Sequence, residues 1–326
     1  MCEQPLNPRL RILLFEFVTD GWNAVYAAPP PPSLAHEGQA MRDALQADLI
    51  AAGHRVVECN GQAPDEFLAR EAPRADWSIV VAPELDGLLL RYCRRASAAG
   101  GYLLACRDDM IGLMSDKHAM CEHLAANGVP TTSGRLIGDA APHQLAIRLP
   151  AIVKPCDGAG SQDLRRIDSW DQLAAATDDG RRWRVEELLQ GVAASVSFLC
   201  GPQGCHPLPP CRQTLAADFA YLGGEFIASR ALQKRAFRLA ARAVATLDRP
   251  RGWIGVDLVL GASSDQDRVV ELNPRLTTSY VGLRTIAEGN LADWMLRIAG
   301  GDRPLLGFRP EAPRFAADGK MALDSV

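Results

Sequence analysis

The sequence lacks three features that would each indicate a different class of protein. Its 35 Lys and Arg residues do not exceed its 39 Asp and Glu residues, so it has no basic surplus for binding nucleic acid. No segment approaches the ~18 uninterrupted apolar residues of a membrane span. The nine cysteines contain no C-x-x-C pair, which favours reduced thiols over a disulfide framework. We therefore expect a cytoplasmic protein with small-molecule partners, no nucleic acid and no membrane.

Familiar nucleotide and zinc motifs are also missing. The chain has no G-x-G-x-x-G fingerprint and no P-loop, in which a lysine follows the glycines. Cys200, Cys205 and Cys211 lie near His206, but a zinc site would need tighter paired spacing and a fourth well-placed ligand. Sites for phosphates or metals must therefore be sought in other patterns.

The first hundred residues alternate apolar runs with helical patterns, as a parallel α/β sheet requires. One predicted helix carries Met41, Leu45, Leu49 and Ala52 at helical spacing, which suits a helix that covers a sheet. A proline-containing loop over 19–33 precedes it, and ligands often bind at such strand ends. We predict strands over 12–18, 55–57, 78–81 and 102–105, and the helix over 34–52.

Two further units follow, in which helices and strands are mixed less regularly. Ser115 is the predicted N-cap of a helix that carries Lys117 in its first turn and ends near Gly128. Later strands are predicted over 135–137, 151–154, 164–167, 184–188, 195–199, 253–260 and 268–272. We predict an α/β and α+β protein divided into 1–112, 113–182 and 183–326.

The most informative segment is a predicted hairpin over residues 253–275. Two β-rich runs flank a polar stretch, and folding them about Ser264 places Asp257 opposite Glu271. The two-residue period of a strand puts Asn273 on the same face as Glu271. Three oxygen-donating side chains then converge.

This convergence suits Mg²⁺, which takes oxygen ligands and shares them with substrate phosphates. Arg275 would reach the same region as a phosphate clamp. The alternative is a solvent-facing acidic pair. Both acids, however, lie inside apolar runs, where an unmatched charge is costly, and a metal would match them.

Two weaker patterns fit a nucleotide. A strand ends in Lys154 and is followed by the small-residue loop Asp157–Ser161, whose glycines would let backbone N–H groups approach phosphates. A plain β-turn fits this loop equally well. The apolar strand that carries Glu186 and Glu187 could line an adenine slot, with an ordinary edge strand as its alternative.

Taken together and in this order, these motifs resemble the ATP-grasp superfamily over about residues 115–293. The resemblance implies an amino-terminal parallel-sheet domain, called pre-ATP-grasp, followed by two α+β subdomains that hold ATP between them. The glutamate that binds ribose in many relatives is missing from Gly191–Ser195. The resemblance implies that phosphates and adenine contact Lys117, Lys154, Asp157, Gly158, Gly160, Ser161, Glu186, Glu187 and Leu188, that Mg²⁺ or Mn²⁺ is held by Asp257, Glu271 and Asn273, and that Arg275 and Lys154 act at the transferred phosphoryl group.

A closer resemblance links four stretches to tyramine-L-glutamate ligases, which serve methanofuran and methylofuran biosynthesis. The stretches are Phe15–Phe17, His36–Met41, Cys211–Gln213 and Glu271–Arg284. The resemblance implies that the γ-carboxylate of L-glutamate is activated as an acyl phosphate and joined to tyramine or a tyrosine-like amine. Arg212 then becomes a third catalytic candidate, with a surface arginine as the alternative.

The sequence leaves other functions open. A ligase for another acid and amine would share every nucleotide residue, and a nucleotide-binding protein without turnover would share most of them. A homodimer is a family-level expectation.

Overall fold

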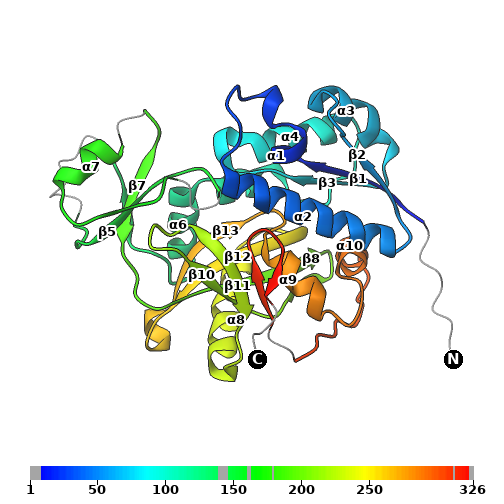
Figure 1. Cartoon of the computed structure of the whole chain (residues 1–326). Helices are drawn as coiled ribbons and strands as arrows, with labels where there is room; N and C mark the ends of the chain where they lie inside the picture. Colours follow the sequence, from blue (N-terminus) through cyan, green and yellow to red (C-terminus); the bar gives the residue numbers. More distant parts are fainter. Residues whose placement is uncertain (1–8, 139–145, 160–162, 178–179, 311–312, 323–326) are drawn as a thin grey trace.

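The computed structural model describes residues 9–138, 146–159, 163–177, 180–310 and 313–322. The described strands form three sheets. In Figure 1 the amino-terminal sheet lies above the largest sheet, and the smallest sheet projects to one side. This arrangement confirms the mixed α/β and α+β class predicted from the sequence. Gly160 and Ser161 lie outside the described residues.

The amino-terminal sheet is parallel, with β1 (Arg11–Glu16) between β2 (Arg55–Glu58) and β3 (Trp77–Val81). Helix α2 (Pro32–Ala51) lies between this sheet and the largest one (Figure 1). Its buried residues include Met41, Leu45 and Leu49, so the predicted covering face is confirmed. The remaining helices here are α1 (Phe17–Asp20), α3 (Pro64–Glu71) and α4 (Leu88–Ala98), with 3-10 turns at Trp22–Ala24, Ala72–Arg74 and Leu85–Gly87.

Two sequence predictions in this sheet were wrong. The strand expected over 12–18 ends at Glu16, because the Glu16 carboxylate accepts hydrogen bonds from the backbone N–H groups of Val18 and Thr19 and so starts α1. The strand expected over 102–105 is only a single parallel bridge between Ser78 and Leu103.

The smallest sheet is antiparallel, in the order β4-β7-β5-β6, and it has its own apolar core around Trp183. Two helices, α5 and α6, connect it to the amino-terminal domain. Ser115 ends α5 and is not an N-cap; Asp116 caps α6 instead, through hydrogen bonds from the N–H groups of His118 and Ala119. The elements are α5 (Asp108–Ser115), α6 (Lys117–Ala126), β4 (Gly134–Leu136), β5 (Ala151–Pro155), β6 (Arg165–Ile167), α7 (Asp171–Ala176) and β7 (Trp183–Glu187).

The largest sheet has the order β13-β12-β8-β10-β11-β14-β15, with β9 beside β8. Helices α8 and α10 pack on its strands, and α9 follows β13 in the sequence. The elements are β8 (Val192–Gly201), β9 (Gly204–Pro207), β10 (Cys211–Leu215), β11 (Tyr221–Phe226), α8 (Arg230–Val244), β12 (Gly252–Leu260), a 3-10 turn (Ser264–Gln266), β13 (Arg268–Asn273), α9 (Ser279–Ile286), α10 (Leu291–Gly300), β14 (Arg314–Ala316) and β15 (Met321–Ala322).

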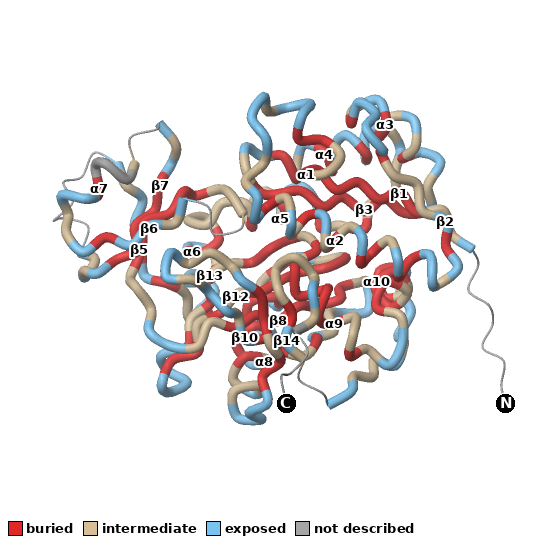
Figure 2. The backbone as a smooth tube through the Cα atoms, in the orientation of Figure 1, coloured by how far each residue is buried: buried red, intermediate tan, exposed pale blue. Residues whose placement is uncertain are grey.

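The amino-terminal and largest sheets share apolar cores. One cluster joins Leu14 and Leu45 to Trp253 and Tyr280, and Figure 2 shows the buried strands of both sheets. Across the same contact, Tyr280 Oη donates to Asp48 Oδ2 at 2.6 Å. The predicted units 1–112 and 183–326 therefore pack against each other, and the predicted boundary at residue 112 falls within α5 (Asp108–Ser115). Within the described part of the chain, none of the helices is long and apolar enough to span a bilayer.

Candidate active site

A cavity of about 340 Å³ lies between the smallest sheet, the β12–β13 hairpin at the edge of the largest sheet and the amino-terminal end of α2. Its wall includes most of the residues that the sequence singled out. From the predicted set, the wall contains Lys117, Lys154, Asp157, Gly158, Glu186, Glu187, Leu188, Asp257, Glu271, Asn273 and Arg275.

The hairpin of β12 and β13 forms the cavity floor as predicted. Asp257 lies directly opposite Glu271 in the strand register, and Gly255 lies opposite Asn273. Asn273 Nδ2 donates to Asp257 Oδ2 at 3.0 Å, and Gln213 Nε2 donates to Asp257 Oδ1 at 2.8 Å. The three predicted metal-binding side chains therefore line the same cavity from one pair of strands.

The charges at this point are unevenly matched. Burial, and then repulsion from Glu271, raises the pKa of Asp257. Burial alone would also raise the pKa of Glu271, but Lys117, Lys154 and Arg275 together hold it below its usual value. Two repelling carboxylates and an amide are a donor set that a divalent cation would stabilise.

This donor set fits magnesium better than zinc. Among the described residues, no group of three or more His, Cys, Asp or Glu side chains is arranged to hold a metal, which leaves the cysteines near His206 without that role. Magnesium is usually held by one or two carboxylates plus substrate phosphates, so a pair of acids with Asn273 is sufficient.

The two lysines enter the cavity from different elements. Lys154, at the end of β5, is buried and its Nζ lies 2.6 Å from Glu186 Oε1. Burial alone would lower the pKa of Lys154, but the carboxylates of Glu186 and Glu271 outweigh it and raise the pKa. Lys117 Nζ donates to the carbonyl oxygen of Gly158 at 2.6 Å and lies 3.6 Å from Glu271 Oε2. Lys154 therefore stays charged beside the carboxylates.

The proposed adenine strand separates its two acids, as strand geometry requires. Glu186 is buried and also accepts from Arg184 Nε at 3.0 Å, so its charge is fully engaged inside the smallest sheet. Glu187 accepts a hydrogen bond from the Ser133 N–H at 3.1 Å. Leu188 follows the strand and lines the cavity.

The loop after Lys154 contacts the amino-terminal domain. Asp157 Oδ2 accepts from the Asp86 N–H at 3.0 Å, and the Gly158 N–H donates to the Glu84 carbonyl at 3.3 Å. Gly158 has a φ of +108°, which a side chain would strain, and its backbone is open to the cavity.

Arg275 lines the cavity, but its strongest partner was not foreseen. Its Nε and Nη2 lie 2.9–3.0 Å from the carboxylate oxygens of the buried Glu84. Glu84 follows β3 in the amino-terminal domain, and no local pattern connects it to Arg275.

The structure does not bring Arg212 to the cavity. Its side chain is 57% exposed and pairs with Glu225 at 3.6 Å. Adjacent strand residues face opposite ways, so the neighbouring Gln213 points inward to Asp257 instead. Strand alternation was the signal that could have favoured Gln213. Glu37, which the sequence analysis did not assign to the site, also lines the cavity.

Comparison with known families and named relatives places the chain among the ATP-dependent carboxylate–amine ligases. The family model of the ATP-grasp domain matches residues 114–279, and that of the pre ATP-grasp 3 domain matches residues 39–111. The chain belongs to the ATP-grasp family.

Named relatives and solved structures agree with this assignment. The chain is 25% identical to the tyramine–L-glutamate ligase of Methanocaldococcus jannaschii over 243 residues, 74% of this chain and 68% of the relative. It is 24% identical to that of Methanocaldococcus fervens over 242 residues, 74% and 72% of the two chains.

The solved structures show the same fold at lower identity. Carboxyaminoimidazole ribonucleotide synthase from Aspergillus clavatus, complexed with ATP, has a TM-score of 0.71 at 17% identity, over 94% of this chain and 81% of that one. The corresponding synthetase from Thermus thermophilus has a TM-score of 0.70 at 16% identity, over 94% and 82%.

Proposed function

We propose that the protein is an ATP- and Mg²⁺-dependent ligase that joins the γ-carboxylate of L-glutamate to tyramine or a tyrosine-like amine. The named relatives support this choice of substrates, because both are tyramine–L-glutamate ligases. On this proposal the product is a γ-glutamyl amide for a methanofuran or methylofuran type of cofactor.

One observation carries the catalytic part of the proposal. Asp257 and Glu271 face each other across one strand pair, with Asn273 beside them and Lys117 within 3.6 Å of Glu271. Acids placed so closely inside a cavity repel each other, and such an arrangement is favoured when the site must bind a cation.

The chain's own residues then have distinct tasks. Lys117, Lys154 and Arg275 supply positive charge to the phosphates while the carboxylate attacks the γ-phosphate. Mg²⁺ held by Asp257, Glu271 and Asn273 would neutralise phosphate charge. Leu188 and the backbone near Glu187 offer an apolar slot to adenine. Asp157 and Gly158 would cover the phosphates and exclude water from the acyl phosphate.

The test is ADP release by the purified protein with ATP, Mg²⁺ and L-glutamate, with and without tyramine or tyrosine. We expect ADP release that depends on the amine and a new γ-glutamyl amide by mass spectrometry. Glu271→Gln should abolish both, because it removes one metal-binding charge and keeps the size of the side chain. Glu122→Gln, an exposed change on α6, is the matched control and should leave both intact.

Other outcomes separate the rival functions. Amide formation with a different acid or amine would keep the ligase chemistry and overturn the substrates. ATP binding without ADP release, across a panel of acids and amines, would contradict catalysis altogether.

A further inference from the structure

Glu37 is an acid of the amino-terminal domain that reaches the catalytic cavity. It lies near the start of α2 and is one of the residues that form the cavity wall. Its Oε2 accepts a hydrogen bond of 2.7 Å from Thr278 Oγ1, three residues after Arg275. Glu37 therefore lies near Arg275. It takes no part in the ion pair of Lys154 with Glu186 in the smallest sheet.

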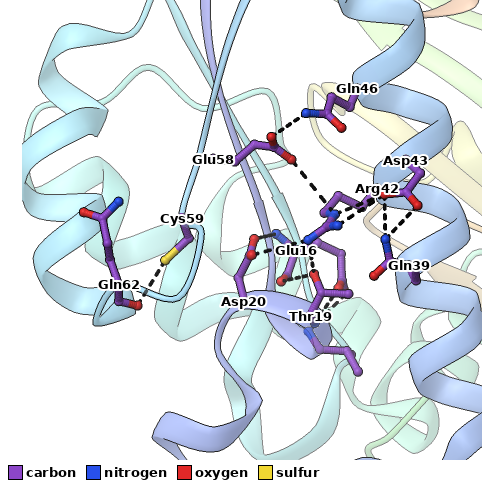
Figure 3. A network of polar contacts seen from close by, with 11 residues as sticks. Glu16, Thr19, Asp20, Gln39, Arg42, Asp43, Gln46, Glu58, Cys59 and Gln62 are labelled. Atoms are coloured by element: carbon purple, nitrogen blue, oxygen red, sulfur yellow. Dashed lines mark hydrogen bonds and ion pairs between the residues drawn. The ribbon is translucent and has the colours of Figure 1, made fainter.

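The position of Glu37 is fixed by the packing of α2 behind it. Gly38 approaches Glu16 so closely that a Cβ would lie 2.8 Å from the Glu16 carboxylate. Figure 3 shows the polar network that holds this part of α2, in which Arg42 contacts Thr19 and Asp20. Because α2 is held on that side, Glu37 is directed to Thr278 on the other.

The negative charge of Glu37 has no direct cationic partner among the described residues. Arg275 is occupied by Glu84, with both carboxylate oxygens of Glu84 in contact. The partner found for the Glu37 carboxylate is the uncharged Thr278 hydroxyl. Burial raises the pKa of Glu37, while Thr278 and Arg275 oppose that rise. A carboxylate placed in this way is suited to binding a cation and accepting a proton.

The surroundings of Glu37 also include an aromatic ring. Tyr221 of β11 lines the same cavity. Burial, followed by the nearby Cys211, Glu37 and Asp257, raises the pKa of Tyr221 well above its usual value, so the phenol stays uncharged. An acid and a neutral ring that line one cavity match a primary ammonium that carries an apolar group.

We propose that Glu37 binds the ammonium of the amine acceptor and takes its proton before the amine attacks the acyl phosphate; this role rests on the proposed function above. One N–H proton passes to the Glu37 carboxylate, and the nitrogen lone pair forms the new C–N bond. The carbonyl C–O bond to phosphate then breaks, and the departing phosphate takes the second proton. Glu37 releases its proton to solvent after the products leave.

The experiment compares two acceptors in the full-length protein. Hydroxylamine is largely uncharged at neutral pH, so it can trap the acyl phosphate as a hydroxamate without a base, whereas an alkylammonium must first lose a proton. We expect Glu37→Gln to keep hydroxamate formation near the wild-type rate. It should lower amide formation from tyramine about 100-fold, the usual order for losing a general base, and raise the KM for the amine.

Two further variants complete the design. Glu66→Gln makes the same change on an exposed site of the same domain and should match wild type with both acceptors. Glu37→Asp keeps the charge with a shorter reach and should restore part of the amide activity. If Glu37→Gln does not fold, Glu37→Asp and Thr278→Val still test the role, since each should reduce amide formation more than hydroxamate formation.

The outcomes distinguish the two levels of the proposal. Equal loss of hydroxamate and amide would show that Glu37 supports phosphoryl transfer, and unchanged amide formation would show no role; either result overturns the assignment. A wild-type protein that makes hydroxamate but no amide with any amine would overturn the proposed function itself and the amine role with it.

Discussion

Two groups of acids beside the cavity are positioned by different means. Asp257 and Glu271 belong to one hairpin and pair across its two strands, 14 positions apart in the sequence. Glu37 and Glu84 come from the amino-terminal domain, and their contacts span 241 and 191 positions. The hairpin acids are therefore placed by local strand pairing, and the amino-terminal acids by the packing of two sheets and α2.

The two groups also differ in how their charges are compensated. Glu84 is buried but forms a bidentate ion pair with Arg275. Asp257 instead faces Glu271. Burial raises the pKa of Asp257, and repulsion from Glu271 raises it further. On the proposed function, we expect the hairpin to give up stability for a binding site, and the Glu84 contact to support both stability and the placement of Arg275.

The largest expected effect is on activity, from Asp257→Asn. The change removes a metal-binding charge, so ADP release should fall by about 10²- to 10³-fold. It also removes the repulsion with Glu271, and the Gln213 amide, which now donates to Asp257, can turn to accept from the new NH2 group. The free energy of unfolding at pH 8 without metal should therefore rise by about 1 kcal/mol. Steady-state ADP release and urea unfolding of the same preparations measure the two effects.

Asp265→Asn is the control for this prediction. It makes the same change at the exposed tip of the same hairpin, so activity and stability should stay close to wild type. An Asp257→Asn protein that loses stability together with activity would contradict our account, since Asp257 would then be a structural residue.

The difference between local and distant placement also explains what the sequence could predict. The register of Asp257 with Glu271 followed from a symmetric hairpin, and Lys117 was correctly placed in the first turn of its helix. The strands that carry Lys154 and Glu186 were found from their apolar runs, within one or two residues of their observed ends.

Contacts between distant segments could not be predicted in this way. Glu84 carries no local pattern, and Glu37 was noted only as part of the His36–Met41 stretch without a role. Their positions depend on how the amino-terminal sheet and α2 pack against the hairpin. Arg212 was selected because the Cys211–Gln213 stretch resembles the ligases, although strand alternation directs Gln213 to Asp257. Ser115 was chosen as an N-cap because the short α5 before it was not recognised.

A smaller effect on activity is expected from Glu84→Gln. Its amide cannot replace both charged contacts with Arg275, so the arginine becomes less constrained beside the phosphates. We expect ADP release to fall about tenfold and the free energy of unfolding to fall by about 2 kcal/mol, since a buried ion pair loses one partner. Turnover measurements and urea unfolding would test this.

A loss of stability in Glu84→Gln would sharpen the comparison between the hairpin acids and the amino-terminal acids, because Asp257→Asn should raise the free energy of unfolding. Glu66→Gln serves as the control in the same domain. Unchanged stability in Glu84→Gln would mean that the ion pair contributes nothing to holding the domains together.

The smallest effect on activity is expected from Glu16→Gln, outside the cavity wall. Burial, with a smaller contribution from Asp20, raises the pKa of Glu16 from 4.5 to about 7, although the N–H groups of Val18 and Thr19 oppose the rise. Turnover should change little, because Glu16 is not among the described residues that line the cavity and approaches α2 at Gly38. The informative measurement is therefore the free energy of unfolding as a function of pH.

The sign of this pH dependence follows from proton binding. Between pH 4.5 and about 7 the folded protein keeps the Glu16 proton, whereas the unfolded chain has released it. Glu16 therefore makes the wild-type protein less stable as pH rises through this window, by at most about 3 kcal/mol. The Gln side chain does not titrate in this range. The free energy of unfolding of Glu16→Gln minus that of wild type should therefore increase from pH 4.5 to pH 8.

Urea unfolding of both proteins at several pH values tests this difference, because the other groups titrate in both proteins and cancel. A constant difference would mean that Glu16 is ionised in the folded protein across the whole range, and that its two backbone hydrogen bonds compensate for its burial.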